Sequence, residues 1–183
     1  VPNCIATFET PPSIKRILSG VFACSSIEVI HILPQVTHIN DCAFEKCHHL
    51  TKVEIPKDSN LQSIGNISFY NTSIESIFIP SHVKVIGDLA FSKCANLTHV
   101  EIPSDSELQT ISKSAFYNSS IECIFIPANV TEIGERAFQK CSKLKSVSFS
   151  RDSKLEEIQL CTFSFTIIES IFIPPHLKVI RPY

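Results

Sequence analysis

The sequence predicts a solenoid, in which successive coils of one chain stack in the same direction and share a parallel β-sheet. Two observations predict it. A phenylalanine recurs at one position with gaps that alternate between 22 and 25 residues. Each repeat also contains a short segment of alternating apolar residues, usually closed by proline, which is typical of a strand. A fixed repeat of this length indicates stacked units rather than a globular fold. The repeated residues are Phe22, Phe44, Phe69, Phe91, Phe116, Phe138 and Phe163.

Two types of unit alternate and form a 47-residue double repeat. The 25-residue unit has the pattern FxxCxxLxxVxIPxDSxLxxI, and the 22-residue unit has the pattern FYNxSIExIFIPxxVxxIG. Copies of the first begin at Phe44, Phe91 and Phe138, and copies of the second begin at Phe22, Phe69, Phe116 and Phe163. We therefore expect about seven turns of alternating 22- and 25-residue units.

Each unit contains one segment of the form LxxVxI or IxxIxI, which is rich in β-branched residues and alternates inward and outward positions. We expect one such strand per turn. Strands that repeat in one direction stack in parallel, about 4.7 to 4.9 Å apart, so they should form one long sheet. The remaining apolar positions should line the interior, where each buried side chain contributes roughly 1.5 to 3 kcal/mol if neighbouring turns cover it.

The two ends depart from the pattern. Residues 1–21 are interpreted as a partial N-terminal repeat, with Phe8 at the position of Ile55 and Ile17 at the position of Ile64. Arg181 begins a C-terminal segment that does not continue the repeat. We expect residues 1–183 to form a single solenoid domain taken from a longer array, because uncapped apolar ends are poorly soluble.

The LxxVxIP strand and the IGxxAFxxC segment, as in Leu50 to Pro56 and Ile86 to Cys94, resemble the BspA-like class of leucine-rich repeats. The resemblance implies a right-handed curved coil with the parallel sheet on its concave face. Members of this class are typically surface proteins of oral bacteria and mucosal protozoan parasites, implicated in binding host cells or matrix proteins. The resemblance therefore implies a binding scaffold.

Composition argues against other classes of function. A net charge of −2 is unsuited to neutralising nucleic-acid phosphates, and no apolar run reaches membrane-spanning length. The 4 glycines form no phosphate-binding motif, and the 7 histidines lie in no catalytic pattern. The same residues recur at every double turn, whereas a catalytic centre needs unlike residues that converge once. We expect no enzyme activity and no cofactor.

The central residue of each strand should point outward, because side chains alternate along a strand. In the 22-residue units this residue is His31, Phe78, Phe125 or Phe172, and in the 25-residue units it is Glu54, Glu101 or Ser148. A row of exposed phenylalanines favours contact with a protein partner. The alternative is that each ring lies flat and shields the sheet.

A second column, three residues earlier in the 22-residue unit, contains Glu28, Glu75, Glu122 and Glu169. We favour a solvated edge over an electrostatic docking strip for this column. Together with Glu54 and Glu101 it would make the concave face acidic and aromatic. A partner with basic and apolar patches would fit that face.

The 8 cysteines do not form an evident disulfide framework. Cys47, Cys94 and Cys141 recur in alternate turns, about 9.5 Å apart, which exceeds the limit of about 7 Å for a bridge. We expect them to be buried apolar thiols. Cys24 and Cys47 are the one candidate pair for a disulfide. No metal site is expected, because the sequence contains no CxxC pair.

Five asparagines occur in the acceptor motif for N-glycosylation, namely Asn66, Asn71, Asn96, Asn118 and Asn129. They favour passage through a secretory route. The leading hypothesis is a non-enzymatic adhesin or receptor ectodomain, secreted or on a cell surface, that binds a host-cell or matrix protein through its concave face. The alternatives are a cytoplasmic scaffold for protein interactions and a self-assembling array with homotypic contacts.

Overall fold

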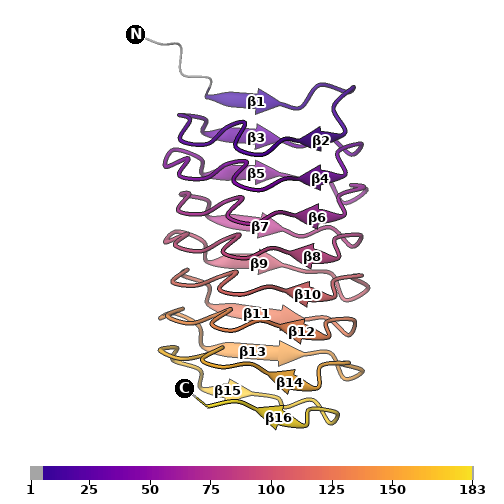
Figure 1. Cartoon of the computed structure of the whole chain (residues 1–183), viewed down its shortest axis with the longest axis vertical. Coiled ribbons are helices and arrows are strands. Elements are labelled where there is room, and N and C mark those ends of the chain that lie inside the picture. The colour runs from indigo at the N-terminus through magenta and orange to yellow at the C-terminus, as the bar shows by residue number, and fades with distance from the viewer. Residues whose placement is uncertain (1–5, 183) are drawn as a thin grey trace.

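The computed structural model describes residues 6–182, which contain strands and turns but no helix. Each coil has one strand on either side of a shared interior, and the coils are stacked one on another along the long axis (Figure 1). The wide sheet contains β1 (Thr7–Glu9), β3 (Val29–His31), β5 (Lys52–Glu54), β7 (Ser76–Phe78), β9 (His99–Glu101), β11 (Cys123–Ile126), β13 (Ser146–Phe149) and β15 (Ser170–Ile171). The narrow sheet contains β2 (Arg16–Ile17), β4 (His38–Ile39), β6 (Ser63–Ile64), β8 (Val85–Ile86), β10 (Thr110–Ile111), β12 (Glu132–Ile133), β14 (Glu157–Ile158) and β16 (Val179–Ile180).

The wide sheet confirms the predicted parallel stacking. Ile30 is in register with Val53, and Ile77 is in register with Val100. Strands pair as β1–β3–β5, β7–β9 and β11–β13–β15. β5 and β7 are also adjacent. Just before these two strands, the Glu75 amide donates a hydrogen bond to the Thr51 carbonyl at 3.2 Å. Like positions therefore form continuous columns along the molecule.

The expectation of one sheet and about seven turns needs correction. The segments after the proline turns also pair in parallel, and the narrow sheet runs without a break from β2 to β12. Eight strands in each sheet make about eight turns. These segments were predicted to form a return side without strands. Only two residues of each coil pair there, and so short a strand leaves little periodicity in the sequence. Once the wide sheet fixes the coil spacing, the backbone on the opposite side is also at pairing distance.

The N-terminal alignment is also corrected. Phe8 is in register with Ile30, and Ile30 is in register with Val53, so Phe8 takes the position of Val53 rather than that of Ile55. The buried Thr10 takes the latter position. Phe8 and Ile17 have the same nine-residue spacing as Ile30 and Ile39, which is the spacing of the shorter unit. This shift places Glu9 in register with His31.

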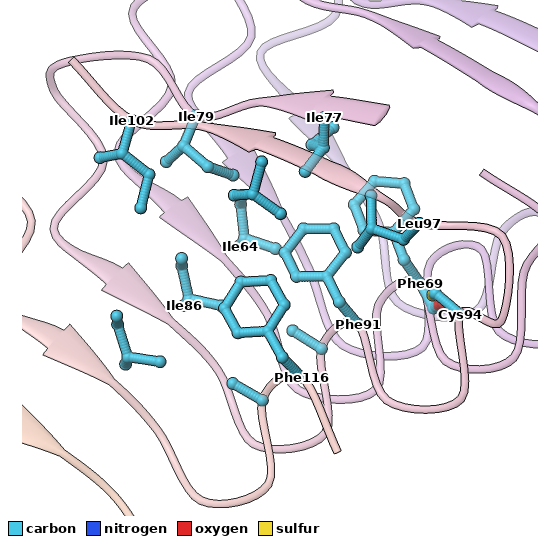
Figure 2. Packing of buried hydrophobic residues seen from close by; sticks show 14 of the residues in the cluster. Ile64, Phe69, Ile77, Ile79, Ile86, Phe91, Cys94, Leu97, Ile102 and Phe116 are labelled. Atoms are coloured by element: carbon cyan, nitrogen blue, oxygen red, sulfur yellow. The ribbon is translucent and has the colours of Figure 1, made fainter. Parts of the chain in front are cut away.

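A phenylalanine ladder fills the interior. The rings of Phe44, Phe69, Phe91 and Phe116 are completely buried and stack with centroids 5.0 to 5.2 Å apart. Figure 2 shows Phe69, Phe91 and Phe116 in a row beside the isoleucines of both sheets. Every ring contacts the ring of the next coil, which explains why one phenylalanine per repeat sets the period.

Each phenylalanine lies in a turn with an unusual backbone. The residues two before and two after it have positive φ, as at Ile67 (φ 58°) and Asn71 (φ 56°) around Phe69. In this turn alternate amides donate to the next coil, as Phe44 does to the Ser68 carbonyl at 2.7 Å. The intervening amides donate within the turn. The turn therefore forms a third ladder of hydrogen bonds between coils.

Gly87 marks a close approach between coils. A β-carbon at this position would lie 2.7 Å from the backbone nitrogen of Asn66 and 2.7 Å from the carbonyl carbon of Gly65. No side chain fits there without moving backbone. This contact explains the glycine that follows isoleucine in the repeat.

Candidate binding surface

The outward column of the wide sheet has the expected orientation. In β7, Phe78 lies between the buried Ile77 and Ile79, and in β11 Phe125 lies between the buried Ile124 and Ile126. Phe78 is in register with Glu101, and Phe125 is in register with Ser148. Both rings are half-buried, so part of each remains accessible on the face of the sheet.

Phe172 differs from the other two phenylalanines. It follows the two-residue strand β15 and is 57% exposed. Other large apolar side chains of the last coils are also exposed, among them Phe165 at 72% and Ile180 at 61%. Phe172 is therefore one of several apolar side chains that are exposed in the last coils.

His31 and Glu54 face each other across two paired strands. They are in register, and His31 Nδ1 lies 2.6 Å from Glu54 Oε2. Lys52 contacts the other carboxylate oxygen. This lysine, helped by His31, lowers the pKa of Glu54 below its usual value. Glu54 therefore stays ionised in the face of the sheet.

A groove of about 480 Å³ crosses the wide sheet over β1, β3, β5, β7 and β9. Four of the predicted residues line it: His31, Glu54, Phe78 and Glu101. Leu33, Pro34 and Pro56 add apolar surface at the ends of the strands. The structure thus gathers four of the seven residues of the predicted column into one concavity that combines apolar and acidic groups.

The groove also contains residues that the sequence analysis did not select. Glu9 lines it because β1 pairs with β3, and the nine-residue spacing from Phe8 to Ile17 was the signal that could have placed it. His99 lines it at the start of β9. It lies two residues before the predicted Glu101 in that strand and so is on the same face, because side chains alternate along a strand.

The second acidic column lies outside this groove. Glu75, Glu122 and Glu169 are exposed, one or more residues before the strands of the wide sheet. Their backbones pair with the intervening coils, as the Thr98 amide does with the Glu75 carbonyl at 3.0 Å. Thr51, Thr98 and Lys145 separate the carboxylates. This geometry matches the solvated edge expected for them.

The cysteine column is buried as expected. Cys94 and Cys141 are fully buried, and their thiols donate to the carbonyls of Phe69 and Phe116 at 3.0 and 3.1 Å. Burial raises the pKa of each thiol to about 11. These cysteines are therefore neutral packing groups.

The candidate bridge between Cys24 and Cys47 is not formed in the structure, where both cysteines are free. Cys47 is buried, and its thiol donates to the Phe22 carbonyl at 2.9 Å. Cys24 is exposed at a turn position with positive φ (58°). Cys47 is in the interior and Cys24 is at the surface, so their side chains are separated although their coils are adjacent.

The five acceptor asparagines have different surroundings. Asn66 accepts a hydrogen bond from the Asp88 amide at 2.8 Å, and the Asn129 amide group donates to the Ser106 carbonyl at 2.9 Å. Asn96 and Asn118 are exposed, and Asn71 is half-buried. Their glycosylation stays a prediction.

In residues 6–182, no group of three or more metal-binding side chains is close enough to coordinate an ion. The same residues contain no helix that could cross a membrane.

The fold is a β-solenoid of the leucine-rich repeat class. Its coils stack in one direction, its strands form parallel sheets, and a ladder of phenylalanine rings fills the interior. The sequence profile of the BspA type leucine rich repeat region matches residues 3–68 and 62–183, with 6 copies. The chain belongs to this family, as the sequence pattern predicted.

Solved structures show the same fold. The pneumococcal vaccine antigen PcpA is 19% identical with a TM-score of 0.77, and the match covers 93% of this chain and 61% of that one. A leucine-rich repeat protein from Bacteroides ovatus is 30% identical with a TM-score of 0.63, over 82% and 49% of the two chains. A leucine rich cell surface protein from Faecalibacterium prausnitzii is 24% identical with a TM-score of 0.57, over 81% and 48%. This chain therefore spans about half to three fifths of their length. No curated protein matches it.

Proposed function

We propose that the protein is a non-enzymatic, protein-binding scaffold that acts as an adhesin or receptor ectodomain, secreted or displayed on a cell surface. One observation carries the proposal: the groove across the wide sheet, which combines the half-buried ring of Phe78 with an acidic rim. Aromatic side chains are enriched at the centre of protein interfaces, and polar or charged groups form the rim.

The charges of the groove indicate the chemistry of the partner. Glu9 and Glu101 form no ion pair with any residue of 6–182, whereas Glu54 is engaged by Lys52 and His31. Two carboxylates therefore remain available to a cationic partner. A host-cell or matrix protein that presents lysine or arginine beside an apolar side chain would satisfy both the acids and Phe78.

The cell-surface location is supported by the relatives and by the sequence. The structure from Faecalibacterium prausnitzii is described as a cell surface protein, and PcpA is described as a vaccine antigen. Five acceptor motifs for N-glycosylation favour a secretory route in an organism that has one.

Replacement of Phe78 by serine tests the proposal. The expected result is a loss of affinity of at least about tenfold for a matrix or host-surface protein that binds the unaltered chain, because a central aromatic anchor is removed. The partner is identified first by surface plasmon resonance against purified matrix proteins. The thermal midpoint of Phe78→Ser is measured in parallel, since the ring is half-buried.

Phe125→Ser is the matched control. Phe125 has the same position two coils along and the same intermediate exposure, but it does not line the groove. We expect Phe125→Ser to weaken binding less than Phe78→Ser. Equal affinities of Phe78→Ser and the unaltered chain, with both folded, would reject the groove as the contact site.

A further inference from the structure

A column of lysine and tyrosine follows the phenylalanine turns on a different side of the coils from the wide sheet. Its members come from five successive coils and alternate along the solenoid: Lys46, Tyr70, Lys93, Tyr117 and Lys140. We call this column the corner strip. The function proposed above makes no use of it.

Backbone and side-chain contacts fix the order of the corner strip. The amide of Lys46 donates to the Tyr70 carbonyl at 2.8 Å, and the amide of Lys93 donates to the Tyr117 carbonyl at 2.8 Å. Lys93 Nζ lies 5.3 Å from the centroid of the Tyr70 ring, and Lys140 Nζ lies 5.5 Å from that of Tyr117. Lys93 and Lys140 thus each contact a tyrosine of the preceding coil.

The cation–π geometry leaves positive charge available. Lys93 and Lys140 form no ion pair with a carboxylate of residues 6–182, whereas Lys46 pairs with Glu45 at 3.1 Å. An aromatic ring attracts a cation without neutralising it. Two ammonium groups two coils apart, about 9.5 Å along the solenoid, can therefore still pair with anions.

The corner strip also borders a shallow pocket of about 340 Å³. Tyr70 and Tyr117 line it with the apolar side chains of Ile67 and Leu89. One further lining residue can exchange hydrogen bonds with a ligand. Glu45 offers the carboxylate oxygen that does not pair with Lys46.

These groups match the chemistry of an acidic sugar. The apolar face of a pyranose packs against aromatic and aliphatic side chains, as at Tyr70 and Ile67. Its hydroxyl groups donate hydrogen bonds to a carboxylate, as at Glu45. Its sulfate or carboxylate groups pair with the ammonium groups of Lys93 and Lys140.

We propose that the corner strip binds an anionic polysaccharide, with one sugar in the pocket between Tyr70 and Tyr117 and the charged groups of neighbouring sugars on the lysines. Repeated sites along a rigid column suit a polymer with a repeated charge, because several weak contacts then act together.

Titration with a heparin oligosaccharide tests the proposal by isothermal calorimetry. The whole 183-residue chain is produced in bacteria, so that Asn71 and Asn118 beside the strip carry no glycan. We expect binding that weakens as salt increases, and no binding to a neutral dextran oligosaccharide. Lys93→Gln/Lys140→Gln should lower the affinity about tenfold or more, because two charge-assisted contacts are lost.

Two further variants separate specific binding from charge alone. Tyr70→Leu should weaken binding several-fold without changing its salt dependence, because it removes stacking and no charge. Lys15→Gln/Lys57→Gln makes the same change of net charge at exposed lysines away from the strip and should bind like the unaltered chain. Circular dichroism confirms that each variant is folded.

Three results would overturn the proposal. The first is equal weakening by the Lys15/Lys57 and the Lys93/Lys140 variants, which would indicate attraction by net charge alone. The second is unchanged binding in Tyr70→Leu and Lys93→Gln/Lys140→Gln. The third is equally tight binding of polyglutamate, which would assign the strip to acidic proteins. The test is independent of the Phe78 variants, because Phe78 lies on the wide sheet.

Discussion

At the scale of single residues, the cysteine column shows how a reactive side chain becomes a packing group. Cys47, Cys94 and Cys141 are fully buried, and each thiol donates to the carbonyl of the phenylalanine 25 residues earlier. A second polar contact comes from Ser25, Thr72 or Ser119. The thiol therefore has its own polar contacts satisfied, and it adds a second donor to a turn carbonyl that also accepts from a backbone amide, as Phe69 does from Thr72 at 3.3 Å.

The raised pKa values predict a loss of stability at alkaline pH. The thiols of Cys94 and Cys141 keep their protons to a pH of about 11 when folded. In the unfolded chain the protons leave near pH 8.5 to 9. Between these values the folded state binds more protons, so the free energy of unfolding should fall as pH rises, by up to roughly 3 kcal/mol per thiol.

Urea denaturation between about pH 8 and pH 10.5 measures this loss. The fall should be steeper for the unaltered chain than for Cys94→Ala/Cys141→Ala, since tyrosine and lysine titrate in both. Cys123→Ala is the control, because Cys123 is exposed in β11 and should leave the slope unchanged. Parallel curves for the unaltered chain and the double variant would show that the buried thiols do not cause the loss.

At the scale of elements, the phenylalanine turn contains backbone conformations that residues with a β-carbon disfavour. Thirteen residues other than glycine have positive φ in residues 6–182, and they lie two before or two after the phenylalanine of a turn. A left-handed conformation costs a residue with a β-carbon roughly 1 to 2 kcal/mol. Hydrogen bonds to the next coil and the stacked rings offset this cost.

Ile67 should be the most strained of these positions, because it is β-branched with φ 58°. Ile67→Asn should therefore raise the free energy of unfolding by about 1 kcal/mol, since asparagine tolerates this conformation. Chemical denaturation measures the change. Ile14→Asn, at an exposed position without positive φ, is the control and should bring no gain. A destabilised Ile67→Asn variant would mean that packing of the isoleucine outweighs its backbone strain.

At the scale of the whole molecule, stability depends on contacts between neighbouring coils. Every ring from Phe22 to Phe163 stacks on the next, but only those of the interior coils are completely buried. Phe163 is only partly buried against the core. In such an array the interior coils have two covered faces and the terminal coils one, so stability should be greatest near the middle.

Phe91→Ala and Phe163→Ala test this gradient. The first should lower the free energy of unfolding by about 3 to 5 kcal/mol, because it removes a buried ring between two others. The second should cost clearly less, since part of that ring is already solvated. Native-state hydrogen exchange should likewise show the strongest protection around β8 to β10. Equal costs at the two positions would contradict a stability that is local to neighbouring coils.

The repeat was readable from the sequence because the same side chain must meet its copy in the next coil. Phe44, Phe91 and Cys94 were placed correctly in the interior, and Phe78 and Glu101 on the outer face of the wide sheet. The narrow sheet was missed, because two paired residues leave little periodicity to detect. Glu9 was missed because the spacing around Phe8 was aligned with the longer unit.

The groove and the pocket could not be inferred from the column pattern. His31 and Phe78 occupy equivalent positions, yet His31 pairs with Glu54 while Phe78 lies opposite Glu101. Phe125 has the same repeat position and lies outside the groove. Which members of a column share a concavity depends on the side chains of neighbouring coils, and the sequence pattern treats those members alike.

By itself, the sequence determined the period, the inward residues and the family, because each of these follows from one coil repeating on another. The tertiary structure decided where the coils pair a second time, which thiols are free and where the surface is hollowed. Those outcomes depend on distances between coils rather than along the chain. A contact such as that of Lys93 with Tyr70 exists only once two turns are placed side by side.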